Sequence, residues 1–180
     1  MIEYYTFKHR GDSLEYLDEV YLTLVPSITV AMFYGSKVRE GARSQALLFS
    51  ELLKNEESAN SIADLDAYME EYLDETSEYL LLRSVNNGIE CFRRGDICAK
   101  IVRNGRISIL PNGYFCLSHE DRIICATSNF YKYLTDEGIL ADALVADTCS
   151  EWMNMLIRRI SDQNQLKCGN LSAVTLKLDT

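Results

Sequence analysis

The candidate catalytic and metal-binding residues of this sequence lie next to apolar segments, mostly where such a segment ends. Residues 122–140, RIICATSNFYKYLTDEGIL, read as an apolar strand that leads into three small polar residues, Thr127, Ser128 and Asn129. Many metalloenzymes carry a metal-binding carboxylate at such a corner, because Mg²⁺ and Mn²⁺ need charged oxygen ligands. This corner carries no carboxylate, so the sequence offers the position of a metal ligand without the ligand.

Carboxylates do occur at other corners and strand ends, namely Asp18-Glu19, Asp96 and Asp121, and His119 stands close to the last of these. Each has a chemical interpretation, as a partial metal site or a general acid, and a plainer one. Asp18-Glu19 would be an acid pair in water at a strand edge, Asp96 a turn cap, and His119 a solvated surface residue. The sequence leaves both interpretations open.

The composition narrows the class of protein. The 180 residues are 47% hydrophobic and carry a net charge of −9, which disfavours nucleic acid and anionic membranes as partners. The six cysteines form no CxxC pair, so we expect reduced thiols packed as small hydrophobic side chains. The N-terminus has charges where a signal peptide needs an apolar core, so a cytoplasmic location is expected.

The elements that must position these residues can be predicted from hydrophobic period and turn signals. Alternating or β-branched runs favour strands, whereas stripes at helical spacing favour helices. The dipeptides Gly95-Asp96, Asn104-Gly105 and Asn112-Gly113 indicate an antiparallel meander. The predicted strands are 2–8, 18–25, 27–34, 89–94, 96–103, 106–110, 114–118, 122–127 and 171–178, and the predicted helices are 38–57, 61–82 and a region within 136–162. This order predicts an α+β fold, a four-layer α-β-β-α sandwich of two antiparallel sheets flanked by helices.

The same order resembles the metal-dependent protein phosphatases of type 2C, whose fold is an α-β-β-α sandwich. RIICATSNFYKYLTDEGI is similar to their Ser-Asp-Gly segment, and GNLSAVTLKL is similar to their closing Asp-Asn-Ile-Thr strand. VAMFYGSKVREGARSQALLFSELL resembles their ADGMGGH loop and its helix, EYLDEVYL their first-strand Glu-Asp motif, and RRGDICAKIV with RNGRISIL their Gly-Asp-Ser strand pair. The resemblance covers residues 1–180 as a single domain, without the family's flap segment, because only the eleven residues PNGYFCLSHED separate Leu110 from Arg122.

The resemblance implies a site in which aspartates bridge two divalent metals that activate water for the hydrolysis of phosphomonoesters. In this sequence the bridging position falls on Met32, and two further metal positions fall on Ser128 and Gly169. The first-strand acid pair is retained as Asp18-Glu19. Three expected carboxylates are therefore missing, one of them replaced by a thioether.

These losses predict a catalytically inactive relative of the type 2C phosphatases that acts as a regulatory or protein-interaction module and needs no cofactor. We expect the former active-site edge to form a binding surface made of Phe33, Tyr34, Gly35, Asn129 and Phe130. By analogy, the partner would be a protein of a Ser/Thr kinase signalling system, with no nucleic acid and no membrane involved.

Two alternatives stay open. One is a divergent metal-dependent Ser/Thr phosphatase that uses Mn²⁺ or Mg²⁺ and rebuilds its site from Asp18, Glu19 and either Asp96 or Asp121. The other is a small-ligand sensor that uses the vacated pocket.

Overall fold

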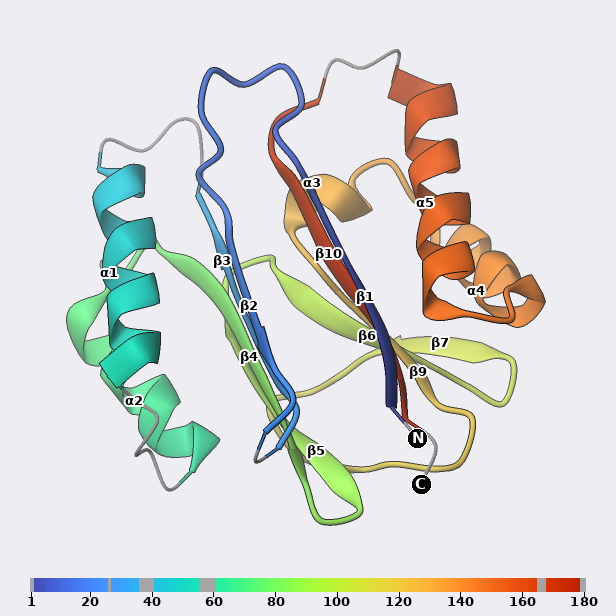
Figure 1. The fold of residues 1–180 in the computed structure, drawn as a ribbon, viewed down its shortest axis with the longest axis horizontal. Coiled ribbons are helices and arrows are strands. Elements are labelled where there is room, and N and C mark those ends of the chain that lie inside the picture. Colours follow the sequence, from blue (N-terminus) through green and yellow to red (C-terminus); the bar gives the residue numbers. More distant parts are fainter. Residues whose placement is uncertain (1, 26, 36–40, 56–60, 165–167, 179–180) are drawn as a thin grey trace. The chain divides into compact units, whose positions relative to one another are not determined.

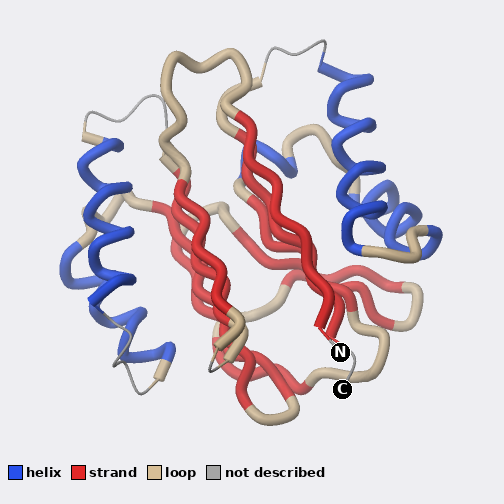
Figure 2. The backbone as a smooth tube through the Cα atoms, viewed as in Figure 1, coloured by secondary structure: helices blue, strands red, loops and turns tan. Residues whose placement is uncertain are grey.

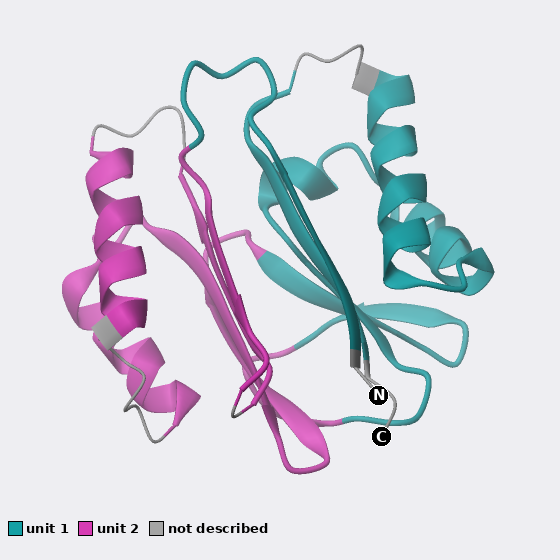
Figure 3. Cartoon of the chain, viewed as in Figure 1, with its two compact units in different colours: residues 1–16, 98–110, 117–180 teal, residues 17–97, 111–116 magenta. Residues whose placement is uncertain are grey.

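A computed structural model describes residues 2–25, 27–35, 41–55, 61–164 and 168–178. The chain divides into two compact units (Figure 3). Unit 1 contains residues 1–16, 98–110 and 117–180, and unit 2 contains residues 17–97 and 111–116. Each unit holds one antiparallel five-stranded sheet with its own helices (Figures 1 and 2). Among the residues described, no helix is both long enough and apolar enough to cross a membrane.

The sheet of unit 1 has the strand order β1-β10-β9-β6-β7. Its central strands are apolar on both faces and therefore buried, as the IIC of β9 and the AVTL of β10 illustrate. Helices cover one face of the sheet, and their core is built around Trp152 and Phe130, both fully buried. The strands are β1 (Ile2–His9), β6 (Cys98–Arg103), β7 (Arg106–Ile109), β9 (Arg122–Ala126) and β10 (Leu171–Leu178), and the helices are α3 (Ser128–Tyr131), α4 (Asp136–Val145) and α5 (Cys149–Asn164).

The sheet of unit 2 has the strand order β2-β3-β4-β5-β8. Helices α1 and α2 cover one face, where Phe33 packs against Phe49 with ring centroids 5.5 Å apart. Ser61 caps α2, since its hydroxyl accepts a hydrogen bond from the Asp64 backbone N–H. The elements are β2 (Glu19–Thr23), β3 (Thr29–Tyr34), α1 (Ala42–Asn55), α2 (Ile62–Tyr72), β4 (Glu78–Val85), β5 (Gly88–Arg94) and β8 (Gly113–Cys116).

Most predicted strands are confirmed, and the closing strand 171–178 has the predicted bounds. The helix predicted over residues 61–82 is wrong in its second half, because α2 ends at Tyr72 and β4 begins at Glu78. The run Tyr79–Leu82 is fully buried and joins the sheet of unit 2. Its apolar residues lie on both faces of the sheet, so their spacing resembles a helical stripe.

The predicted antiparallel meander is also wrong. Residues 86–88 do join a hairpin, β4 to β5, and Asn104-Gly105 joins the hairpin β6 to β7. Gly95-Asp96, however, connects β5 of one sheet to β6 of the other, and Asn112-Gly113 follows a return to the first sheet. A turn dipeptide marks where a strand ends and carries no information about which sheet receives the next strand.

Candidate functional site

The corner after β9 is the start of a short helix. Thr127, which is fully buried, precedes α3, and its backbone N–H donates to the Ser172 carbonyl at 3.0 Å. Its hydroxyl lies 3.4 Å from both the carbonyl oxygen and the amide nitrogen of Ser172. The position of the expected metal ligand, Ser128, is thus the first residue of a helical turn that is tied to β10.

An amide network connects this corner to the N-terminal loop of unit 1. The Asn129 side chain donates to the backbone carbonyl of Asn170 at 3.1 Å. The side-chain nitrogen of Asn170, which is 2% exposed, donates to the carbonyls of Arg10 and Glu15, both at 3.0 Å. The bonds of Asn170 to Arg10 and Glu15 link residues 160 and 155 positions apart, and the bond between Asn129 and Asn170 joins the segments that contain Ser128 and Gly169 through a neutral amide and a carbonyl.

The loop held by this network is tightly built. The backbone N–H of Asp12 donates to the Cys168 carbonyl at 2.8 Å. Gly11 has a φ of +65°, and a Cβ atom there would lie 1.9 Å from the same carbonyl oxygen, so only glycine fits. Leu14 lies in this loop and is 94% exposed. The loop therefore presents one large apolar side chain from a fixed base.

Met32, which the sequence resemblance aligns with the bridging aspartate, lies on β3 of unit 2 and is fully buried. Its neighbours Ala31 and Phe33 point into the helix-covered core, so the alternation of a strand places Met32 on the opposite face of the sheet. Its cross-strand partners are the apolar residues Val20 and Leu80. A thioether sulfur is a soft donor that suits neither Mg²⁺ nor Mn²⁺.

The retained acid pair does not lie in water as expected. Asp18 is fully buried, and its Oδ1 accepts a hydrogen bond from the Gly35 backbone N–H at 3.3 Å. Gly35 packs closely against Leu17, because a Cβ atom at Gly35 would lie 2.4 Å from the Leu17 carbonyl oxygen. Asp18 thus joins the chain before β2 to the end of β3, and Glu19 is half-buried on β2.

The other two acidic candidates have separate surroundings. Asp96 is exposed in its turn, and its backbone N–H donates to a carboxylate oxygen of Glu78 at 3.2 Å. Asp121 is 1% exposed and is bound by the Arg103 guanidinium and by the Ser118 backbone N–H. Asp96 belongs to unit 2 and Asp121 to unit 1.

The predicted binding surface is not a surface at three of its five positions. Phe130 is fully buried in the core of unit 1, Phe33 is 2% exposed in the core of unit 2, and Gly35 is buried. Tyr34 and Asn129 are half-buried. The two phenylalanines fill helix-facing cores, which a local sequence pattern does not distinguish from an exposed aromatic patch.

The residues that the sequence resemblance aligns with the family's metal positions do not fit a pair of divalent metals. Met32 offers sulfur, Ser128 a neutral hydroxyl, and Gly169 no side chain. Across the described part of the chain, no group of three or more His, Cys, Asp or Glu side chains is arranged to hold a metal ion.

A half-buried hydroxyl, Tyr131, and a buried thiol, Cys149, stay protonated at neutral pH. Burial raises the pKa of Tyr131 well above its ordinary value, and its hydroxyl donates to the Ile124 carbonyl at 2.8 Å. Burial, with the nearby Glu3 carboxylate, raises the pKa of the Cys149 thiol to about 11. Neither group is therefore a nucleophile or a base at neutral pH.

Comparison with known proteins places the fold. No protein-family model matches the sequence, and no curated protein matches it. Solved structures do match, among them the serine/threonine phosphatase of S. agalactiae, with a TM-score of 0.80 at 11% identity over 99% of this chain and 100% of that chain. RsbX in complex with magnesium matches with a TM-score of 0.79 at 12% identity, over 99% of this chain and 96% of the other. The catalytic domain of the serine/threonine phosphatase PstP in complex with two manganese ions matches with a TM-score of 0.73 at 15% identity, over 99% of both chains.

These matches confirm the predicted α+β fold and the resemblance to the type 2C phosphatases. The chain has the fold of the type 2C serine/threonine phosphatases over nearly its whole length. Identities of 11–15% establish the fold alone, so function has to be argued from the residues of this chain.

Proposed function

We propose that this protein is a catalytically inactive member of the type 2C phosphatase fold that acts as a regulatory, protein-binding module. The observation that carries the proposal is that Met32 is fully buried, because the sequence resemblance aligns Met32 with the family's bridging aspartate. A metal-activated hydroxide requires ligands that hold the cation, and here a thioether, a hydroxyl and a glycine replace three carboxylates.

The remaining acids support the same proposal. Asp18 accepts a backbone hydrogen bond from Gly35, and Asp121 is committed to Arg103, so each carboxylate already has a structural role. Asn170 and Asn129 join the two family motifs of unit 1 through bonds that need no cation. In this proposal, hydrogen bonds of neutral amide groups stabilise the segments that bind metal ions in an active phosphatase, and the protein loses the metal-dependent reaction.

The loop of residues 10–16 is the part of this surface that we propose as the contact for a protein partner. Leu14 is 94% exposed while the base of its loop is fixed by Asn170, and a preorganised apolar side chain loses little entropy on binding. By analogy with the fold, the partner belongs to a Ser/Thr kinase signalling system. A photoreactive residue in place of Leu14 should give a discrete protein adduct in cells, whereas one in place of Val25, also 79% exposed, should not.

Hydrolysis of p-nitrophenyl phosphate with and without Mn²⁺ tests whether the protein is inactive. We expect no Mn²⁺-dependent turnover from the wild-type protein. Turnover that is abolished by Asp18→Asn but kept by Asp74→Asn, a matched change at an exposed acid that is not a candidate ligand, would instead establish a divergent phosphatase with a rebuilt metal site. Near-ultraviolet circular dichroism of both variants separates loss of activity from loss of fold.

A further inference from the structure

A cavity of about 260 Å³ lies in unit 1 at the N-terminal end of β9. Its lining includes Asn104, His119, Glu120, Arg122, Leu144 and Lys177. Ser128 follows the other end of β9, which spans Arg122–Ala126, and the four residue steps of that strand correspond to about 13 Å. The cavity is therefore separate from the degenerate site.

Two cations lie side by side in this cavity. Lys177 on β10 is the direct cross-strand partner of Arg122 on β9, so both side chains project from the same face of the sheet. Arg122 is held in place because its Nη1 donates to the Ala146 carbonyl at 2.6 Å. Like charges directly opposite each other on neighbouring strands repel, and the Glu3 carboxylate on the other side of Lys177 balances one of the two positive charges, so a further anion would stabilise the arrangement.

The acids around the cavity do not form ion pairs with these two cations. Asp121 is bound by Arg103, which neutralises its charge, and Glu120 is exposed on the adjoining turn. Glu3 on β1 is the cross-strand partner of Lys177, and its Oε1 accepts the Cys149 backbone N–H at 2.8 Å, so its single negative charge faces the two cations from one side only. Among the ion pairs formed within the described ranges, none includes Arg122 or Lys177.

We propose that this cavity binds a small phosphate-type oxyanion, either inorganic phosphate or the phosphate group of a small phosphomonoester. Arg122 and Lys177 supply the positive charge, and Asn104 and His119 supply further hydrogen-bond donors. A dianion matches two adjacent cations better than a monoanion does. The volume is slightly below the roughly 300–1,000 Å³ of typical small-molecule sites, which suits a ligand of this size. The proposal does not depend on the residues at the metal positions. The chain as a whole has a net charge of −9, so the anion would be attracted by the local charge of Arg122 and Lys177 and not by the overall charge of the protein.

Calorimetric titration at constant ionic strength tests the site, with inorganic phosphate, phosphoserine and acetate as probes. Phosphate or phosphoserine should bind saturably at one site, and whichever binds more tightly identifies the source of the phosphate group. Lys177→Gln should weaken binding at least about tenfold, because a charge-assisted hydrogen bond is lost. Lys132→Gln, which removes the same charge from an exposed position outside the cavity, should leave the affinity unchanged.

A second measurement covers the case in which Lys177→Gln does not fold. In the wild-type protein, phosphate should shift the backbone amide resonances of Gly105 and Lys177 saturably, while that of Lys132 stays in place. The proposal is overturned if neither phosphate probe binds saturably, if acetate binds as tightly as phosphate, or if the two lysine variants lose affinity equally.

Discussion

The amide network at Asn170 gives a prediction whose size can be worked out from the structure. Asn170 is 2% exposed and donates to the carbonyls of Arg10 and Glu15, both at 3.0 Å. Asn170→Asp keeps the shape of the side chain and removes both donors. Losing two hydrogen bonds of about 1 kcal/mol each, and leaving their carbonyls unsatisfied, should reduce the free energy of unfolding by about 3 kcal/mol. For a chain of 180 residues this corresponds to a fall in Tm of about 6–12 °C.

The pH dependence of this variant follows from the same geometry. Burial and two facing carbonyl oxygens raise the pKa of the introduced carboxyl group above the value of about 3.9 that it has in the unfolded chain. A raised pKa means that the folded state binds the proton more tightly, so acidic pH favours folding of the variant relative to neutral pH. The stability deficit should therefore be largest at pH 7 and should shrink as the pH falls towards about 4.

Urea unfolding of the wild-type protein, Asn170→Asp and Asn112→Asp at pH 7 and pH 5 is the assay. Asn112 is a matched control because it is exposed and its single side-chain bond, to the Arg93 carbonyl, is long at 3.4 Å. Its substitution should change stability by less than about 0.5 kcal/mol. Equal, pH-independent losses in the two variants would refute the role that we assign to Asn170.

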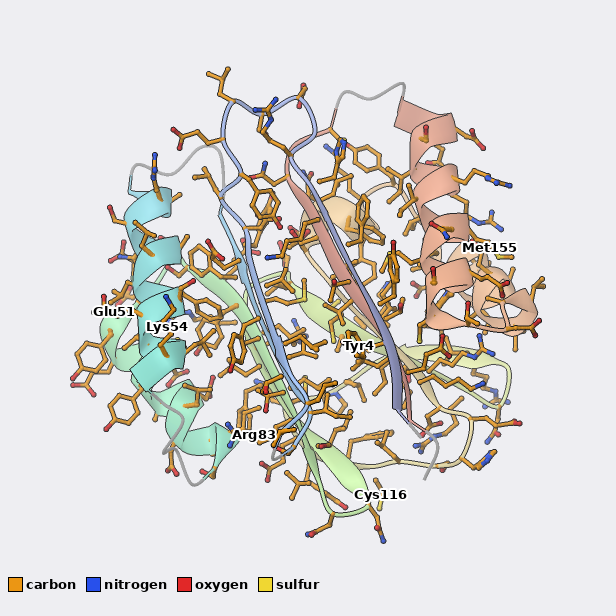
Figure 4. The ribbon with its side chains drawn as sticks, in the orientation of Figure 1. Tyr4, Glu51, Lys54, Arg83, Cys116 and Met155 are labelled. Atoms are coloured by element: carbon orange, nitrogen blue, oxygen red, sulfur yellow. The ribbon has the colours of Figure 1, made fainter. Side chains whose placement is uncertain are left out.

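Four further predictions concern the buried side chains Met32, Cys149 and Asp121 and the exposed Cys116. In urea unfolding, Met32→Leu should lower the free energy of unfolding by less than about 1.5 kcal/mol, whereas Met32→Asp should lower it by more than about 3 kcal/mol because it buries an unpaired charge. Equal losses would show that Met32 is not in an apolar environment. Ellman's reagent should label one thiol of the native protein at pH 8, Cys116 (labelled in Figure 4), because it is the exposed cysteine among six, and Cys116→Ser should abolish the labelling. The Cys149 thiol, whose pKa is raised to about 11, should stay unlabelled in the same experiment, and early labelling would contradict its burial. Because the thiol of the unfolded chain ionises at lower pH than the thiol of the folded chain, the contribution of Cys149 to stability should be lost as the pH rises from about 9 to about 11. Asp121→Asn should destabilise by about 2 kcal/mol in thermal unfolding, because a buried partner of a guanidinium is neutralised, whereas the exposed Asp96→Asn should change little; similar effects would contradict the difference in burial.

Local sequence patterns predicted the helices and strands well where the hydrophobic periodicity was unambiguous. The closing strand 171–178 and the start of the helix at Asp136 agree with the structure, because a run of apolar and β-branched residues and a capping threonine are local signals. The run Tyr79–Leu82 was assigned to a helix because a strand buried on both faces has no period of two. The short helix α3 was missed, since four residues are too few to show a helical stripe.

The candidate site was predicted in part. The missing carboxylates at Met32, Ser128 and Gly169 follow from the sequence once the resemblance fixes the positions, and their role as degenerate metal positions stays a prediction. The burial of Asp18 and the bonds of Asn170 could not be predicted, because their partners arrive from distant parts of the chain. Long-range hydrogen bonds of single side chains leave no period in the sequence.

Calorimetric titration of the wild-type protein with Mn²⁺ tests the central claim most directly. The account predicts no tight binding, because sulfur, a neutral hydroxyl and a glycine stand where three anionic ligands are needed. Tight, saturable binding of two Mn²⁺ ions per chain would contradict it and would show that other carboxylates of this protein assemble a metal centre.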